Sequence, residues 1–130
     1  MEETKFHVKI VGIIFDPKKR RILLGKEKGF EKVSFIEESL SYDEELDVTL
    51  KRVIKEKTGY KVHNLGAVYA ENVLKDPDKL KIHFLCEATE GEEKPSEEVE
   101  ELIWVKPSEV EETLEVKLPT RLREYITNLE

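Results

Sequence analysis

The sequence predicts a single α/β domain. A strong helix signal spans residues 41–60, where apolar residues recur at helical spacing and Gly59 stands where a left-handed C-terminal cap is needed. Strand-like segments rich in β-branched and aromatic residues lie on both sides of it, at residues 6–15, 21–25, 60–73, 80–88 and 102–105. The 130 residues show no internal repeat and no dividing linker, which predicts one domain over residues 1–130.

The helix segment carries the most specific local pattern. Ser41 followed by Glu44 forms a capping-box pattern, so the helix is predicted to begin at Ser41. An apolar face is formed by Leu46, Leu50, Val53 and Ile54. The other side carries Glu44, Arg52 and Glu56, with Arg52 one turn before Glu56. Because the apolar face must pack on the sheet, we expect the Arg52–Glu56 ion pair to be partly buried.

Turn signals predict how the other segments connect. Residues 16–19 join the first two strands into a hairpin, and residues 75–78 form the turn of a second hairpin. His83, in the returning strand of that second hairpin, is expected to be a partly buried histidine with satisfied nitrogens. The strand with Trp104 leads into a short helix, and a final helix opens at residues 119–120.

Composition excludes several function classes. The net charge of −7 makes a nucleic-acid backbone an unsuitable partner. Charged residues are 39% of the chain, with one Met and no Gln, a bias typical of thermophilic proteins. Cys86 is the only cysteine, so no internal disulfide can form. No signal peptide or membrane-length apolar run is present, which predicts a cytoplasmic protein without a membrane partner.

Residues 38–60 resemble the Nudix box, G-x5-E-x7-R-E-U-x-E-E-x-G-U, in which U is a bulky apolar residue. The matching positions are Glu44, Arg52, Ile54, Glu56, Gly59 and Tyr60. Three functional positions differ: Glu38 replaces the opening glycine, Val53 the glutamate after the arginine, and Lys57 the last glutamate. The resemblance extends from the first hairpin to the strand with Trp104. It implies a Nudix-like α/β/α sandwich with a mixed sheet between helices.

The resemblance also implies a chemistry. Nudix enzymes cleave the diphosphate bond of a nucleoside diphosphate linked to another group, with Mg2+ or Mn2+ neutralising the diphosphate oxygens. The three box glutamates lie at i, i+3 and i+4 and share one helix face. Those positions are Val53, Glu56 and Lys57 here, so one carboxylate remains. Glu56 is implied as a metal ligand and, with Glu44 and Arg52, as part of the catalytic set.

Two further segments bear on the metal site. Residues 36–38 replace the Pro-Gly-Gly of Nudix proteins, whose glycines let a backbone carbonyl approach a metal. Glu37 and Glu38 either place side-chain carboxylates near such a metal or form a solvated strand end. Residues 87–101 carry eight glutamates against one lysine, with Gly91 and Pro95 arguing against a regular element. They are either a solvated acidic loop or, as in many Nudix proteins, a source of a further metal ligand from Glu97 or Glu98.

Three functions are consistent with these residues. The first is a Nudix-fold protein with a degenerate metal site, catalytically weak or inactive. It binds a nucleoside-diphosphate-type or other phosphorylated ligand, and Lys57 supplies a positive charge in place of the metal. The second is an active Mg2+-dependent hydrolase that uses Glu44, Glu56 and the loop glutamates. The third is a structural or protein-interaction module. The first needs no metal cofactor, the second needs Mg2+ or Mn2+, and the resemblance allows a homodimer in each case.

Overall fold

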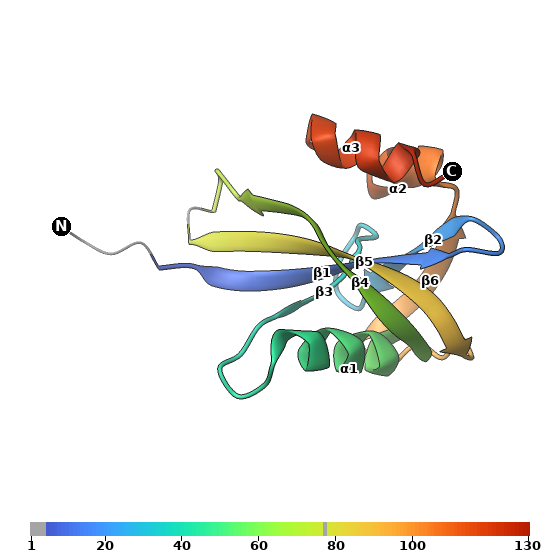
Figure 1. Cartoon of the computed structure of the whole chain (residues 1–130), viewed down its shortest axis with the longest axis horizontal. Coiled ribbons are helices and arrows are strands. Elements are labelled where there is room, and N and C mark those ends of the chain that lie inside the picture. Colours follow the sequence, from blue (N-terminus) through green and yellow to red (C-terminus); the bar gives the residue numbers. More distant parts are fainter. Residues whose placement is uncertain (1–4, 77) are drawn as a thin grey trace.

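A mixed sheet lies between helices in the computed structural model, which describes residues 5–76 and 78–130 (Figure 1). The elements are β1 (His7–Asp16), β2 (Arg21–Glu27), β3 (Ile36–Ser39), α1 (Leu46–Thr58), β4 (Tyr60–Asn72), β5 (Lys79–Gly91), β6 (Val99–Val105), the 3-10 turn η1 (Pro107–Glu109), α2 (Val110–Leu114) and α3 (Thr120–Thr127). The strand order is β4-β5-β1-β2-β6, with β3 pairing with β1 off this path. β1 and β5 run parallel and the other pairs are antiparallel. The predicted α/β sandwich is confirmed.

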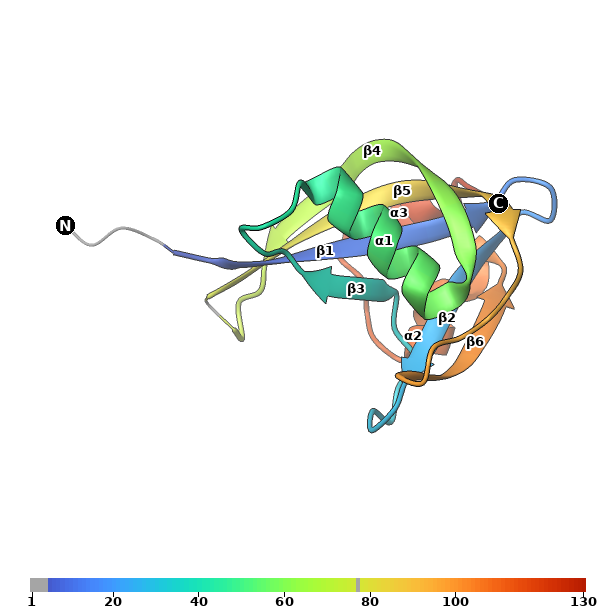
Figure 2. The same ribbon diagram turned by 90° about the horizontal axis from the view of Figure 1, so that it is seen from below.

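Each face of the sheet buries its own apolar cluster. α1 covers one face, and α2 and α3 cover the other (Figures 1 and 2). The α1 cluster comprises Ile10, Ile14, Leu23, Ile36, Leu50, Val53, Ile54, Val62, Phe84 and Cys86. The α2–α3 cluster comprises Val11, Ile13, Ile22, Leu24, Phe35, Val105, Val110, Leu114, Leu118, Leu122 and Ile126. Neighbouring residues of β1 divide between the clusters because successive strand side chains point to opposite faces.

Both predicted hairpins are present. β1 pairs with β2 around the turn at residues 17–20, and β4 pairs with β5 along almost their whole lengths. Pro77 of the second predicted turn lies outside the described residues. The prediction of an irregular segment over residues 87–101 is wrong for most of its length, because β5 continues to Gly91 and β6 begins at Val99. Pairing with β4 and β2 supplies backbone partners that local residue preferences do not reveal.

α1 begins later than predicted. Its first helical residue is Leu46, and Glu45 is the N-cap without a side-chain hydrogen bond, so the predicted capping box at Ser41 is wrong. The reason is that the Glu44 carboxylate accepts hydrogen bonds from Arg52 and Thr49. The Glu44 carboxylate therefore binds side chains of the helix and does not accept a hydrogen bond from any described backbone N–H at its N-terminus. The predicted C-terminus is confirmed, with Gly59 in the left-handed region at φ 88°.

The end of α1 lies against the segment that joins β5 to β6. The backbone N–H of Lys94 donates to the Thr58 carbonyl at 2.8 Å, and the N–H of Ser96 donates to the Lys57 carbonyl at 3.4 Å. These bonds satisfy carbonyls that a helix C-terminus leaves without intrahelical partners. The segment passes so close to the end of α1 that a β-carbon on Gly59 would lie 2.7 Å from the Lys94 backbone nitrogen. Residues 92–96 are therefore fixed against the helix end.

Candidate functional site

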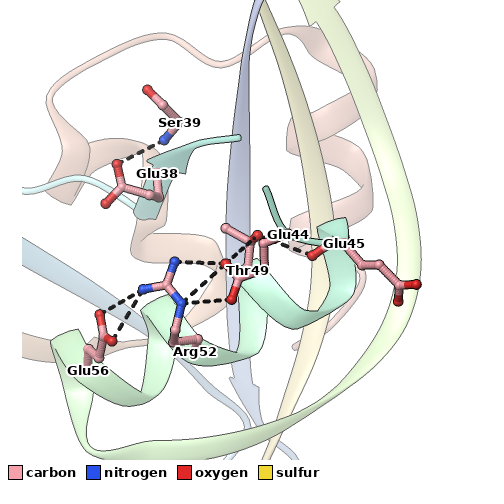
Figure 3. A network of polar contacts seen from close by, with 7 residues as sticks. All are labelled: Glu38, Ser39, Glu44, Glu45, Thr49, Arg52 and Glu56. Atoms are coloured by element: carbon pink, nitrogen blue, oxygen red, sulfur yellow. Dashed lines mark hydrogen bonds and ion pairs between the residues drawn. The ribbon is translucent and has the colours of Figure 1, made fainter. Parts of the chain in front are cut away.

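The polar side of α1 is organised by one arginine (Figure 3). The Arg52 guanidinium donates to the Glu44 carboxylate at 2.9–3.2 Å and to the Glu56 carboxylate at 3.1–3.2 Å. The Thr49 hydroxyl donates to the same Glu44 carboxylate at 2.8 Å. The structure therefore brings together the three residues expected as a catalytic set, in a chain of ion pairs along the helix.

These ion pairs lie at the surface. The exposed side-chain fractions are 25% for Glu44, 47% for Arg52 and 60% for Glu56. The expected partial burial of the Arg52–Glu56 pair is wrong, because the buried stripe of α1 points into the sheet and leaves Arg52 facing water. The Arg52 guanidinium, followed by the Thr49 hydroxyl, lowers the pKa of Glu44 below its usual value of 4.5. Both carboxylates also raise the pKa of Arg52, so the guanidinium is charged at all working pH values.

Lys57 is buried, unlike Arg52. Only 7% of the residue is exposed, and its ammonium donates to the Glu27 carboxylate and, at 3.0 Å, to the Glu37 carbonyl oxygen. Three elements thus meet at this nitrogen: α1, the end of β2 and β3. A buried ammonium needs a counter-charge and hydrogen-bond acceptors, and these two oxygens provide them. Sequence reasoning missed both partners, which lie 30 and 20 residues before Lys57 in the chain.

The residues at the box positions do not fit a divalent metal cluster. Val53 is 4% exposed and belongs to the α1 core cluster, so this position contributes packing only. Glu56 points outward to Arg52, and Lys57 directs its cation toward Glu27. No group of three or more His, Cys, Asp or Glu side chains able to hold a metal occurs within residues 5–76 and 78–130. The fit fails because a cation and an apolar side chain stand at two of the three ligand positions.

The loop carboxylates do not complete such a site. Glu97 and Glu98 are exposed, and neither side chain makes a hydrogen bond or ion pair with another described residue. Glu98 is held by its backbone, whose carbonyl accepts a hydrogen bond from the Lys28 N–H at 2.7 Å. The Glu93 carboxylate instead accepts a hydrogen bond from the Trp104 indole at 3.2 Å. The acidic segment therefore serves the edge of the sheet and leaves Glu56 without a carboxylate neighbour from the loop.

A cleft of about 1220 Å³ lies beside Lys57, on the side of the sheet that α2 and α3 partly cover. Its walls are the loop at residues 29–35, the hairpin end at 71–75 and the segment at 114–120. Its floor includes Lys9 of β1 and Lys81 of β5, and Glu27 and Lys57 lie at one end. Sequence reasoning did not find this cleft, because its parts come from segments far apart in the chain.

His83 lies in the floor of the cleft. It is 4% exposed and packs edge-on against Phe35 and Tyr69, with ring centroids 6.2 and 5.8 Å away. Its Nδ1 atom has no hydrogen-bond partner among the described residues, so the expectation that both nitrogens are satisfied is wrong. Burial, followed by the charge of Lys81, lowers its pKa from 6.5 to about 4, and a backbone hydrogen bond with Tyr69 opposes this. The ring is therefore neutral at pH 7.

This burial predicts a pH-dependent stability. Above pH 6.5 the ring is neutral in both states; between pH 6.5 and about 4 only the unfolded chain takes up the proton, so the free energy of unfolding falls. The loss is about 3 kcal/mol and stays constant below pH 4. His83→Phe should remove it. Urea unfolding at several pH values measures the difference between wild type and variant, and the same slope in both would contradict the prediction. His63→Phe, at an exposed position of β4, is the control that keeps the slope.

Comparison with known proteins decides the family. The chain matches the NUDIX domain over residues 5–129, which is nearly its whole length. The chain belongs to the Nudix family. A search of curated proteins found no match.

Solved Nudix structures share the fold at low identity. A MutT structure from work on Aliivibrio salmonicida and Vibrio cholerae is 17% identical, with a TM-score of 0.75 over 94% of this chain and 96% of the other. MutT from Methanosarcina mazei is 19% identical, with a TM-score of 0.70 over 99% and 96%. An ADP-ribose pyrophosphatase from Streptococcus suis is 19% identical, with a TM-score of 0.71 over 93% and 88%. Identities this low establish the Nudix fold and leave the activity open.

Proposed function

We propose that this Nudix domain binds a phosphorylated small molecule and hydrolyses it weakly or not at all. The observation that carries the proposal is the environment of Lys57. Its ammonium lies between the Glu27 carboxylate and the Glu37 carbonyl, beside the helix face where box glutamates would hold a metal. The protein thus carries its own cation in this region. A divalent ion approaching these oxygens would meet a fixed positive charge at short range.

The other box positions support the same conclusion. Metal-dependent cleavage of a diphosphate needs several carboxylates that converge on hydrated Mg2+ or Mn2+. Val53 is part of the core, and the Glu56 carboxylate is ion-paired with Arg52. We therefore assign Arg52, Glu44 and Glu56 a role in ordering the helix surface. Lys57 lies at the end of the cleft and holds there, through hydrogen bonds, the oxygens of Glu27 and Glu37 that a metal would otherwise bind.

The cleft supports ligand binding. Its volume of about 1220 Å³ is above the range of about 300–1,000 Å³ that is common for ligand pockets, so the cleft has room for a small molecule of nucleotide size. Its lining combines apolar side chains from three segments with lysines on the floor and rim. This mixture matches a molecule with a phosphorylated part and a less polar body.

The test combines hydrolysis and binding with one ligand, ADP-ribose. With Mg2+, turnover should stay far below the ordinary enzyme range of about 1–1,000 per second. With EDTA, calorimetry should still detect binding. Glu56→Gln is the matched variant and should leave both measurements unchanged, because this proposal gives Glu56 no metal. Turnover of about 1 per second or more that is lost in Glu56→Gln would instead establish the active hydrolase. Absence of both binding and turnover would favour an interaction or structural module.

A further inference from the structure

We propose that Lys9 and Lys81, adjacent on the floor of the cleft, hold the phosphate of a ligand whose planar apolar body rests against Phe30. The ligand class is a phosphate ester of an aromatic group. This inference rests on the proposed function and deepens it, because it places the phosphate on the sheet and away from the box helix.

The two lysines are neighbours by strand register. Lys9 of β1 pairs directly with Lys81 of the parallel strand β5, so both side chains leave the same face of the sheet on strands about 4.8 Å apart. Both are partly buried and line the cleft. Like charges at directly opposite positions of a sheet destabilise it. An anion between the two ammonium groups would remove that repulsion.

Neighbouring carboxylates offset only part of the repulsion between Lys9 and Lys81. Glu37 approaches Lys81 at 3.5 Å, whereas Lys9 has no ion-pair partner among the described residues. Glu71 pairs with Lys81 along β4, and its carboxylate makes no ion pair within the described part of the chain. His83, next on this face of β5, is neutral at pH 7 and adds no charge. One ammonium is thus available for an anionic ligand, with a second beside it.

The charge of the cleft differs from that of the whole protein. Six lysines and five glutamates line the cleft, a net charge of +1, while the chain carries −7. The net negative charge of the chain repels a phosphate at long range. The cleft therefore does not share the negative excess of the whole chain, and it offers ammonium donors to an anion.

Exposed apolar residues at the mouth of the cleft are the basis for the apolar part of the proposed ligand. Phe30, Leu74 and Val116 come from three different segments, line the same cleft, and are 62%, 87% and 47% exposed. Single exposed apolar residues are ordinary, but three around one opening indicate a surface that a ligand covers. Phe30 offers a ring face for stacking against a planar group. An ester carries both a phosphate for the floor lysines and a planar group for Phe30, whereas free phosphate lacks the second part.

The test uses 1-naphthyl phosphate, inorganic phosphate and 1-naphthol as probes, with EDTA, in calorimetric titrations of the whole chain. Lys9→Gln and Lys81→Gln should each raise the Kd for 1-naphthyl phosphate about tenfold, as loss of a charge-assisted contact does. Lys18→Gln, which removes an exposed lysine in the β1–β2 turn, is the control and should leave that Kd unchanged. Phe30→Ala should weaken binding of 1-naphthyl phosphate and leave that of inorganic phosphate unchanged. Thermal unfolding confirms that each variant is folded.

The outcomes separate the two proposals. If wild type binds ADP-ribose without metal but Lys9→Gln and Lys81→Gln behave like Lys18→Gln, the phosphate lies elsewhere and only this inference fails. Failure of wild type to bind 1-naphthyl phosphate has the same meaning. If ADP-ribose is not bound at all, the proposed function fails first and this inference with it. Equal affinity for 1-naphthol and 1-naphthyl phosphate would also overturn the role of the lysines.

Discussion

Gly59→Ala should lower the free energy of unfolding by about 3–5 kcal/mol, the sum of two separate costs. Gly59 has φ 88°, where a residue with a β-carbon is strained. The added β-carbon would also overlap the Glu92 carbonyl oxygen and lie 2.7 Å from the Lys94 nitrogen. Both contacts are with backbone, so no side-chain rotation relieves them. The segment that holds the end of α1 would have to move.

Gly29→Ala separates the two costs. Gly29 has nearly the same backbone conformation, φ 90°, but a β-carbon added there would meet no atom within 4 Å. This variant should therefore lose only about 1 kcal/mol. Urea unfolding of both variants measures the difference. Equal losses would show that the strand connection yields easily and that only the backbone conformation matters at Gly59.

Lys57→Glu should destabilise the protein by about 3–5 kcal/mol without divalent metal, because it removes a buried cation and leaves several oxygens facing one another. The introduced carboxylate would meet the Glu27 carboxylate and the Glu37 carbonyl, which now accept hydrogen bonds from the ammonium. A set of oxygen ligands of this kind suits Mn2+ or Mg2+. Mn2+ should therefore raise the unfolding temperature of this variant and leave wild type unaffected.

Lys57→Met is the matched control. It keeps much of the side-chain volume and removes the charge, so it should cost about 1–3 kcal/mol, less than a fully buried pair because Glu27 is 26% exposed. With no added carboxylate, Mn2+ should not restore its stability. Thermal unfolding with EDTA and with Mn2+ compares the three proteins. If Mn2+ stabilised wild type as much as Lys57→Glu, Lys57 would not stand in for a metal.

Restoring a second box carboxylate would be harder. Val53 is packed in the α1 core cluster, so Val53→Glu buries a charge among apolar side chains. The structure thus distinguishes two kinds of departure from the box. At Lys57 a charged ammonium replaces the box carboxylate and still faces polar groups beside the cleft. At Val53 an apolar side chain replaces the box carboxylate and belongs to the core. A change at Lys57 alone is the informative one.

The sequence by itself determined the fold class, the family resemblance and the end of α1. Helical periodicity and strand composition are local signals, and Gly59 is required by a local backbone conformation, so each is readable from neighbouring residues. The spacing of Arg52 and Glu56, one helical turn apart, likewise predicted that their side chains would meet. These predictions needed no knowledge of distant segments.

Only the tertiary structure decided what those residues do. The partners of Lys57 come from β2 and β3, and the pairing of Lys9 with Lys81 follows from the parallel alignment of β1 and β5. The exposure of Arg52 and the burial of His83 depend on which segments cover them. Ion pairing and burial depend on distances between segments that are far apart in the chain. Those distances are fixed only when the sheet assembles, so the local sequence pattern does not reveal them.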